Sequence, residues 1–440
     1  MNVYVTQWPG RKNGLAKRVT GWVPSYAASG IGAFELPPLA QTQFGPTSSS
    51  LGYDPICDYN VGQFPGEPTR IGTGAEIQAC SRACHKRGLR LTADWPIHQY
   101  GGRPPYVERG SNGKPDRKLF FKAAGLFGGP RDRLFDPEIV PDDGTRVNYQ
   151  TSKPAGYMLK QKQLSGRWLD ARLGLDGFRE DEAKSESIAT SRALNAARPG
   201  MNVAEVYTGD MNELDAFWRQ VGIPVIDFPY HYACRDVSNG AGFGRLVDSA
   251  YADRNPEGAY RYVESLDTDG PGGVVNNKLW FYLHGMTTPC KGFRIYAGDF
   301  EGYGLGKWIL NYAWISSLAL GPLLYQHVED DILCWSRDGN GGPFGRTAGL
   351  ICGISKDPVN TRWIWVNTPF GPNKQLHNYA TSGGPDVWTN ADGWANLPFG
   401  PNVFGSAQNG FAYSLAGHQG RIRLPALPDH INGSLTDFSM

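Results

Sequence analysis

The chain alternates short apolar segments with stretches of helical periodicity from its first residues to about residue 330. This alternation is typical of a parallel sheet whose strands are joined by helical crossovers. We interpret eight apolar segments as strands: 2–8, 31–36, 89–94, 175–180, 201–206, 223–228, 292–297 and 322–326. Helices are expected between them, near 14–29, 74–87, 156–172, 187–197, 211–220 and 305–319. Eight such units predict a closed (β/α)8 TIM barrel. An open doubly wound sheet usually begins with a glycine-rich fingerprint, which the first turn, "PGRKNG", lacks.

Two regions break the alternation. Residues 99–152 have little periodicity and follow the third expected strand, where a long loop of a barrel lies on the catalytic face. From residue 342 onward, segments such as "TRWIWVNTP" and "GFAYSLAG" read as strands separated by Gly, Asn and Pro turns. We therefore expect an α/β protein whose barrel is formed by 1–98 and 153–341, with an inserted domain at 99–152 and a C-terminal antiparallel β domain at 342–440.

Composition narrows the range of partners. The 43 basic and 42 acidic residues nearly cancel, so we expect neither nucleic acid nor a membrane surface as partner. The seven cysteines are scattered without a second pair at zinc spacing, which favours buried free thiols. The start of the chain, "MNVYVTQWPG", shows no signal peptide. The protein would then be cytoplasmic, or secreted with its leader already removed.

Charged residues stand where the predicted strands end. Asp94 follows the third strand, and Arg179 with Asp181 follows the fourth. The ends of the fifth, sixth and seventh strands carry Glu205, Asp227 and Asp299. Barrel enzymes place their catalytic groups at these carboxyl ends, and burying so many carboxylates is costly unless they are paired or used. Glycoside hydrolysis requires such a set, with one carboxylate as nucleophile and another as general acid. Asp227 we expect to be structural.

The segment "GFREDEAKS" at 177–185 resembles the second motif of the α-amylase family of glycoside hydrolases, Gly-Phe-Arg-x-Asp-Ala-x-Lys-His. The resemblance implies that Asp181 is the nucleophile, with Arg179 beside it, and that Lys184 binds substrate. Glu205 in "VAEVYTG" matches the third motif, whose Glu is the general acid and base. "LPPLAQ" and "GYDPICDYNVGQF" resemble the second strand and a Gly-Tyr-Asp loop, which makes Tyr53 a platform for the sugar next to the cleaved bond. "VIDFPYHYACRD" and "GPLLYQH" resemble the sixth and eighth strands.

The first and fourth motifs depart from the family pattern. The first motif usually ends in Asn-His, but here Asp94 is followed by "WPIHQ". Either His98 occupies the Asn position, or a deletion makes His98 the sugar-binding His of the family. The fourth motif, usually Asn-His-Asp, reads "AGD" at 297–299, so the resemblance implies that Asp299 stabilises the transition state without its His neighbour.

Several other residues could either bind substrate or stabilise the structure. Asp94 would organise the site, and Trp95 and Tyr207 could stack on sugars or pack in the core. Lys184 could equally be a solvated charge. No cofactor is needed for the chemistry. The resemblance also implies that a structural Ca²⁺ ion could bind between the barrel and the inserted region, where Asp132, Asp136, Asp142 and Asp143 offer hard oxygen ligands.

Pairing within the site can also be anticipated. Arg179 and Asp181 are two apart on a strand and therefore share a face. The guanidinium would keep the Asp181 carboxylate ionised and oriented. Glu205 has no such partner in the sequence, and a less polar setting would raise its pKa, as a general acid requires.

The sequence thus predicts a retaining α-glucan hydrolase that cleaves α-1,4 bonds in starch, glycogen or maltooligosaccharides through a covalent glycosyl-enzyme. The alternatives are a transglycosylase or small-oligosaccharide-specific α-glucosidase of the same family, or a catalytically weak glucan-binding protein. We expect an α-glucan as partner and a monomer in solution. The C-terminal β domain would either support the barrel or bind polymer, and the resemblance favours support.

Overall fold

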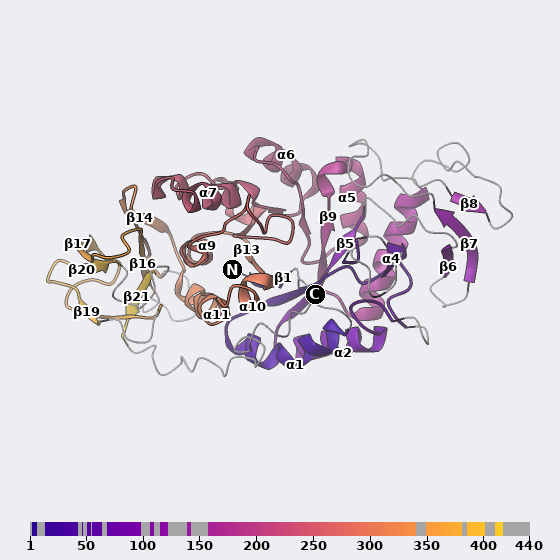
Figure 1. The fold of residues 1–440 in the computed structure, drawn as a ribbon, viewed down its shortest axis with the longest axis horizontal. Helices are drawn as coiled ribbons and strands as arrows, with labels where there is room; N and C mark the ends of the chain where they lie inside the picture. The colour runs from indigo at the N-terminus through magenta and orange to yellow at the C-terminus, as the bar shows by residue number, and fades with distance from the viewer. Residues whose placement is uncertain are drawn as a thin grey trace. The chain divides into compact units, whose positions relative to one another are not determined.

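Eight parallel strands close a barrel in a computed structural model of the chain (Figure 1). The structure describes residues 2–6, 14–42, 46, 51–53, 55–63, 68–97, 106–109, 115–121, 139–141, 157–339, 349–380, 385–400 and 410–416. The strand order around the barrel is β1-β13-β12-β11-β10-β9-β5-β2. Their bounds are β1 (Asn2–Thr6), β2 (Ala33–Leu36), β5 (Arg90–Pro96), β9 (Gly177–Asp181), β10 (Val203–Ala204), β11 (Val225–Ile226), β12 (Ala259–Tyr262) and β13 (Gly292–Tyr296). The predicted TIM barrel is confirmed.

The described chain divides into two compact units. The N-terminal unit comprises Tyr4–Ala27 and Gly32–Ile226, and the main part of the C-terminal unit begins at Asp227. Helices of the N-terminal unit are α1 (Leu15–Ala28), α2 (Gly74–Lys86), α4 (Tyr157–Leu173), α5 (Ile188–Ala197) and α6 (Met211–Val221). Their positions agree with the sequence pattern because their ends carry clear signals.

Helices α2 and α6 show these end signals. Helix α2 starts at a capping box, in which Thr73 and Glu76 satisfy each other's backbone amides. Helix α6 starts at Asp210, whose side chain accepts from the Asn212 amide, and ends at Gly222 with φ of 88°.

The inserted region carries a small sheet of its own. Strands β6 (Tyr106–Arg109), β7 (Pro115–Phe121) and β8 (Ile139–Pro141) form three antiparallel strands in that order. A two-stranded ribbon, β3 (Gln41–Thr42) with β4 (Pro55–Cys57), precedes Asp58.

The C-terminal unit begins with helices that follow the later barrel strands. They are α7 (Phe228–Ser238), α8 (Tyr251–Arg254), α9 (Lys278–Thr287), α10 (Ala297–Glu301) and α11 (Gly306–Ile315). Asp227 caps α7 and is fully buried, where it accepts hydrogen bonds from the amides of Tyr230 (3.1 Å), Tyr251 (3.0 Å) and Ala252 (2.9 Å). Asp227 is therefore structural, as expected.

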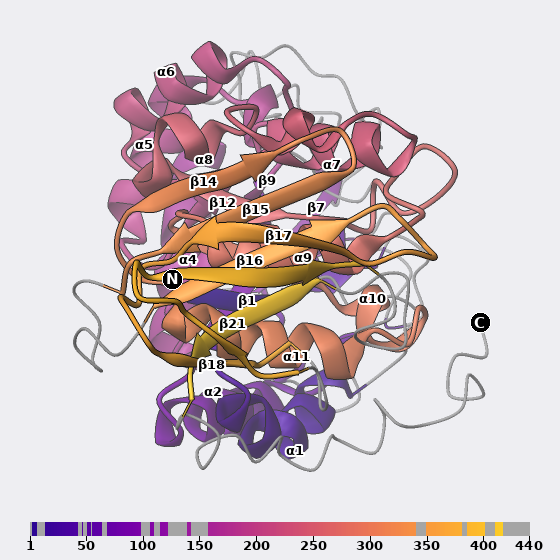
Figure 2. The ribbon, with the colours of Figure 1, turned by 90° about the vertical axis from the view of Figure 1, so that its left-hand side faces the viewer.

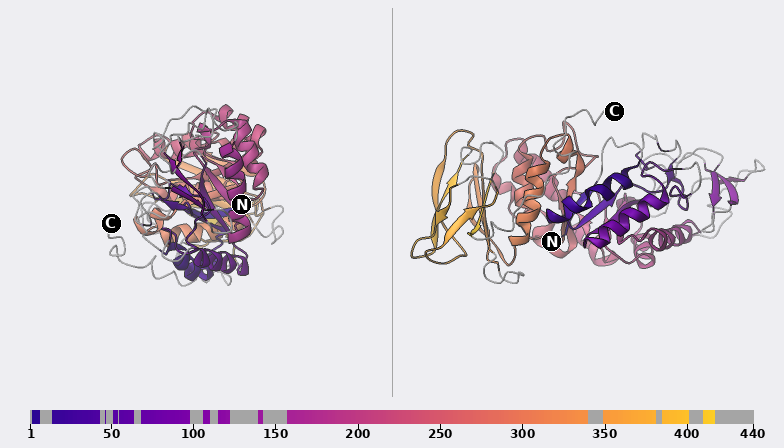
Figure 3. Two further views of the ribbon diagram at one scale, coloured as in Figure 1. Left: turned by 90° about the vertical axis from the view of Figure 1, so that its right-hand side faces the viewer. Right: turned by 90° about the horizontal axis from the view of Figure 1, so that it is seen from below.

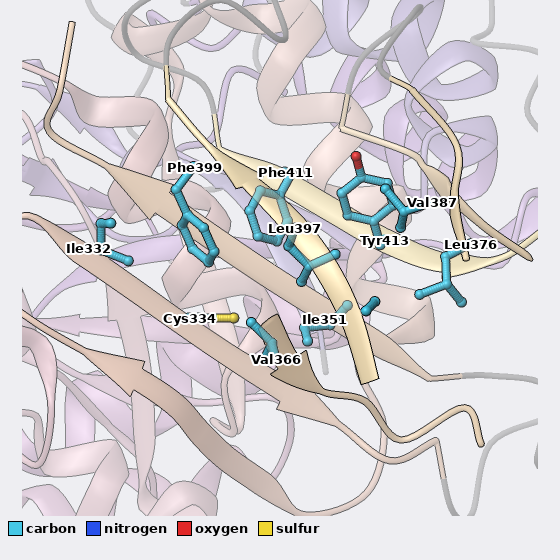
Figure 4. Packing of buried hydrophobic residues seen from close by; sticks show 11 residues of the cluster. Ile332, Cys334, Ile351, Val366, Leu376, Val387, Leu397, Phe399, Phe411 and Tyr413 are labelled. Carbon is cyan, nitrogen blue, oxygen red and sulfur yellow. The ribbon is translucent and has the colours of Figure 1, made fainter. Parts of the chain in front are cut away.

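Antiparallel strands form the end of the chain, as predicted (Figure 2). One sheet has six strands in the order β14-β15-β16-β21-β18-β19, and a second pairs β17 with β20. The bounds are β14 (Leu323–Val328), β15 (Ile332–Arg337), β16 (Leu350–Ser355), β17 (Arg362–Asn367), β18 (Gln375–Asn378), β19 (Val387–Trp388), β20 (Trp394–Phe399) and β21 (Phe411–Leu415). The right-hand view of Figure 3 shows these strands, in orange and yellow, nearly on edge. Apolar side chains from both sheets, including Val366, Leu397 and Phe411, make their common core (Figure 4).

The structure corrects the assignment of two barrel strands. The seventh strand is β12 (Ala259–Tyr262), which the sequence pattern did not predict. The segment 322–326, expected as the eighth strand, lies in β14, which pairs antiparallel with β15. Asp299 therefore follows the eighth barrel strand, β13, and not the seventh. The antiparallel region also begins at Leu323, before the predicted boundary at residue 342.

The six cysteines whose side chains are described are all free, as the sequence favoured. Among the described helices, none combines the length and the apolar character needed to cross a membrane.

Candidate active site

Arg179 joins three carboxylates in the N-terminal unit. Its Nη1 donates to Asp94 Oδ2 at 2.6 Å and to Asp181 Oδ1 at 2.7 Å, and its Nη2 forms an ion pair with Glu205 Oε1. The guanidinium is 1% exposed, so water does not screen these contacts. The residues predicted at the ends of the third, fourth and fifth strands therefore share one cation.

Strand register explains this convergence. Strand β5 pairs in parallel with β9 so that Asp94 stands opposite Arg179. Strand β10 continues from the other edge of β9, and the amide of Glu205 donates to the carbonyl of Glu180 at 3.0 Å. Because parallel strands present their carboxyl ends at one edge, three neighbouring strands deliver four charged side chains to one place.

The electrostatics of this cluster differ from the expectation. Burial raises the pKa of Asp181, Arg179 opposes this shift, and the neighbouring Asp94 and Glu205 raise the pKa further, so that it lies well above its usual value. Arg179 orients Asp181 but divides its charge among three carboxyls. Three carboxyls around one cation would carry a net negative charge if all were ionised, so the cluster retains a proton more readily than separate groups would.

Glu205 is not in the apolar setting that the sequence suggested. Besides its ion pair with Arg179, its Oε2 accepts from the backbone amide of Glu182 at 3.0 Å. Glu182 adopts a left-handed conformation with φ of 51°, which is uncommon for a residue with a side chain. The Glu182 amide, directly after Asp181, therefore links Glu205 to the end of strand β9.

Tyr53 binds this cluster directly, whereas the side chain of Lys184 contacts residues outside it. The hydroxyl of Tyr53 donates to Asp94 Oδ2 at 2.6 Å, and burial raises the pKa of Tyr53, which keeps the hydroxyl a donor. Lys184 Nζ donates to the carbonyl of Tyr207 at 2.6 Å and lies 3.7 Å from Glu213 Oε2. The Tyr207 ring is 53% exposed, so its face is accessible to a ligand.

Trp95 does not belong to the site. It follows Asp94 on strand β5, and successive strand residues point to opposite faces. Its ring is 3% exposed and packs edge-on against Phe178, with the Arg198 guanidinium 4.4 Å from the ring centre. The core alternative is therefore the correct one for Trp95.

Asp299 lies in a closed environment of the C-terminal unit. Its carboxylate is fully buried and accepts from Lys278 Nζ and from the Tyr282 hydroxyl, each at 2.5 Å. Burial raises the pKa of Asp299 to about 6, while Lys278 and Tyr282 oppose the shift. Both oxygens are used within the protein, as in a structural ion pair.

The loop after the seventh strand offers another carboxylate, which the sequence analysis missed. Strand β12 is followed by "VESLDTDG" at 263–270, in which Asp267 lies three residues after Glu264. Glu264 organises the loop, because its carboxylate accepts from the amides of Ser265 and Val274. Asp267 is exposed. The signal that could have found it was present in the sequence, but only once β12 is counted as a strand.

Two predictions concern a Ca²⁺ site and His98 as a sugar ligand. His98 and the four aspartates suggested for Ca²⁺ lie outside the described residues. Within the described part of the chain, no group of three or more His, Cys, Asp or Glu side chains is placed to hold a metal ion. At the end of β5, the buried Lys162 donates to Asp58 Oδ1 and to the Pro96 carbonyl, both at 3.0 Å.

Comparisons with known proteins agree with the barrel fold. The chain is 25% identical over 446 residues to glucan 1,4-alpha-maltohexaosidase of Bacillus sp. (strain 707), covering 83% of this chain and 84% of that protein. The crystal structure of gamma-CGTase from alkalophilic Bacillus clarkii superposes with a TM-score of 0.71 at 16% identity, covering 94% of this chain and 70% of that one. An Anoxybacillus alpha-amylase superposes with a TM-score of 0.67 at 13% identity, covering 94% and 98%. No family model matches the chain.

The chain has the α-amylase-like fold. The resemblance expected from the sequence is confirmed at the level of fold and of kinship with a glycoside hydrolase. Within the α-amylase-like barrel, the described residues gather the Arg179 cluster at the ends of the third, fourth and fifth strands.

Proposed function

We propose that the protein is a retaining α-glucan hydrolase. The observation that carries the proposal is the buried Arg179 guanidinium, which binds Asp181 and Glu205 through neighbouring nitrogens. A retaining glycosidase needs two carboxyl groups close together, about 5–5.5 Å apart, one as nucleophile and one as acid. The maltohexaosidase relative supports an α-1,4-linked glucan as substrate.

In this mechanism Asp181 attacks the anomeric carbon of the sugar. Glu205 gives its proton to the departing glycosidic oxygen, so the bond breaks and a glycosyl-Asp181 ester forms. Glu205, now ionised, takes a proton from water, which attacks the same carbon and releases the sugar with its configuration retained. The mechanism requires that the proton retained by the Arg179 cluster lies on Glu205, so that Asp181 is ionised when substrate binds.

A third carboxylate would stabilise the positive charge that develops on the sugar ring. We assign this role to Asp267, since it follows the seventh strand and is exposed. Asp299 is the alternative. The sequence pattern favours Asp299 only if it ends the seventh strand. In the structure its two oxygens already bind Lys278 and Tyr282.

Hydrolysis of maltoheptaose, followed by proton NMR from the first minutes, tests the proposal. Products that first appear as α-anomers, together with loss of turnover in Glu205→Gln, would support a retaining hydrolase. β-anomers would contradict the double displacement. Products longer than the substrate would instead indicate a transglycosylase, and binding without any products would indicate a glucan-binding protein.

A further inference from the structure

Four tryptophans on the C-terminal sheets are exposed to solvent. Their exposed fractions are 54% for Trp363, 55% for Trp365, 60% for Trp388 and 41% for Trp394. Trp335, in the same region, is fully buried, so this domain has a core in which a large ring can be packed. Large aromatic rings left in water on a folded domain are unusual enough to indicate a binding surface.

Strand alternation places these rings on one face. The inward residues of β17 and β20, such as Val366, Ala395 and Leu397, fill the core shared with the six-stranded sheet (Figure 4). The residues between them therefore point outward. On β17 these are Trp363, Trp365 and Asn367, and on β20 they are Trp394 and Asn396.

Strand β19 extends the same face. The bridge between Thr389 and Ala395 sets β19 beside β20, and both residues are buried. Val387 is buried as well, so Trp388, between Val387 and Thr389, points outward with the other rings. We call Trp363, Trp365, Trp388 and Trp394 the tryptophan face.

Amide side chains alternate with these rings. Across the β17–β20 ladder, Trp365 stands opposite Asn396, and Asn367 stands opposite Trp394. Asn367 is exposed, whereas Asn396 Oδ1 is buried without a hydrogen-bond partner among the described residues, so Asn367 is the amide that a ligand can reach. Trp363 and Trp365 are about 7 Å apart along the strand, so each ring could stack on a different unit of one chain-like ligand.

Charged residues of both signs surround the face. Arg362 donates to Glu329 Oε2 at 2.9 Å, and Asp386 pairs with His377 at 2.6 Å. Lys374, whose carbonyl accepts from the Thr389 amide, and Asp392, two residues before Trp394, are both exposed. The described residues around the face therefore show no excess of positive charge that would select an anionic polymer. A protein partner would bury the amides and require each of them to be paired. A neutral sugar chain fits better, because its rings have apolar faces and its hydroxyls both donate to and accept from amides.

We propose that the tryptophan face is a second, non-catalytic binding site for an α-glucan chain, which holds polymeric substrate on the C-terminal β domain. The class of ligand rests on the proposed function, whereas the existence of the site rests on the exposed rings. The face then adds polymer binding to the supporting role expected for this domain.

Adsorption of the full-length protein to insoluble starch tests the site. The double substitution Trp363→Ala with Trp365→Ala should weaken adsorption at least about tenfold, which corresponds to about 1.4 kcal/mol. Trp365→Tyr alone, which keeps a ring, should retain most of the binding. Leu164→Ala is the matched control, since Leu164 is 43% exposed and belongs to helix α4 of the N-terminal unit. All variants should unfold at the same urea concentration, because the changed side chains are on the surface.

Three results would overturn the proposal: adsorption unchanged in the double variant, equal adsorption to cellulose, or a wild-type dimer that the double variant converts to monomer in sedimentation. The last would make the face a contact between copies of the chain. Maltoheptaose turnover separates this proposal from the proposed function. Adsorption that depends on the tryptophans, without turnover, would support the second binding site and contradict the proposed hydrolase function. Turnover without such adsorption would support the hydrolase function and contradict the second binding site.

Discussion

Arg179 is the residue on which the candidate site depends. A lysine at this position would keep one positive charge but could not present two nitrogens in a plane to Asp94, Asp181 and Glu205. We expect Arg179→Lys to lower kcat/KM by about 10² or more and the free energy of unfolding by about 3 kcal/mol, because buried carboxylates lose their partner. Enzyme kinetics and urea denaturation measure the two effects. Arg192→Lys, at an exposed arginine of α5 that donates to Gln220, should change neither. Full activity in Arg179→Lys would refute the central role of the guanidinium.

Asp267 and Asp299 can be distinguished by what their removal does. Asp267→Asn should lower kcat by about 10² or more with little change in stability, since the side chain is exposed. Asp299→Asn should destabilise the protein by about 3 kcal/mol, because the buried Lys278 loses its close partner and keeps only Asp269 at 3.8 Å. The pair of variants is compared by turnover of maltoheptaose and by thermal unfolding. An Asp299→Asn variant that is stable but inactive, beside an active Asp267→Asn, would return the third role to Asp299.

His231 makes the stability depend on pH. Burial lowers the pKa of His231 from 6.5 to about 4, although the hydrogen bond to the Val263 carbonyl opposes the shift. Between these values the unfolded chain binds a proton that the folded protein does not, so stability is fully present above pH 6.5 and is lost as the pH falls toward 4. The loss should be about 3 kcal/mol, measured by urea denaturation at pH 7 and pH 4.

The matched variant for this pH dependence is His231→Phe, which keeps a ring against Tyr262 but cannot titrate. It should be less stable at pH 7 through the lost hydrogen bond, yet lose less stability on acidification. The same pH dependence in the variant and in the wild type would show that other groups cause it.

At the scale of elements, the sequence pattern failed to predict a strand where tertiary contacts, and not local composition, decide the structure. Strand β12 has Arg261 in its centre, a residue that a search for apolar segments rejects. In the fold Arg261 is fully buried and neutralised by Asp253, which lies in another element. Nothing in the sequence indicates that Arg261 and Asp253 form an ion pair. The strand and the carboxylates that follow it were therefore not predicted.

The opposite error occurred at β14. Its apolar residues resemble a buried strand, but they alternate between half-buried and exposed positions. The acidic turn Glu329-Asp330-Asp331 that follows returns the chain into β15 as an antiparallel hairpin. Strand β14 therefore belongs to the C-terminal sheet and not to the barrel.

The Arg179–Asp181 pair, in contrast, was predictable, because β9 fixes it locally. Arg179 and Asp181 are on one strand, and Gly177 begins that strand where a side chain would strike the backbone of Met201, 2.4 Å from its carbonyl oxygen. We expect Gly177→Ala to displace β9 and lower the free energy of unfolding by about 1–3 kcal/mol, with a loss of activity. Gly21→Ala, in an open position of helix α1, should instead be neutral or slightly stabilising. Denaturation and turnover of both variants provide the check, and an unaffected Gly177→Ala would show that β9 can shift without harm.

At the scale of the molecule, the C-terminal sheets are joined to the helical part of their own compact unit through a small number of buried polar contacts. Arg337 on β15 donates to the carbonyls of Thr287 and Gly321, each at 2.8 Å, and Trp335 Nε1 donates to Thr287 Oγ1 at 2.9 Å. Thr287 is the last residue of α9, so its free carbonyl is satisfied by a strand of the β domain. Helix and sheet therefore complete each other's hydrogen bonds, and we infer that they unfold together.

Replacing Arg337 tests this coupling. Arg337→Met keeps the apolar stem but leaves the Thr287 and Gly321 carbonyls without their donor, and should lower the free energy of unfolding by about 2–4 kcal/mol. Calorimetry should show one transition shifted as a whole, because α9 and the sheets share these contacts. Arg362→Met, at an exposed arginine of β17 paired with surface carboxylates, should change stability by at most about 1 kcal/mol. A separate early transition in Arg337→Met would mean that the β domain unfolds on its own, and then the tryptophan face could be moved to another protein without the barrel.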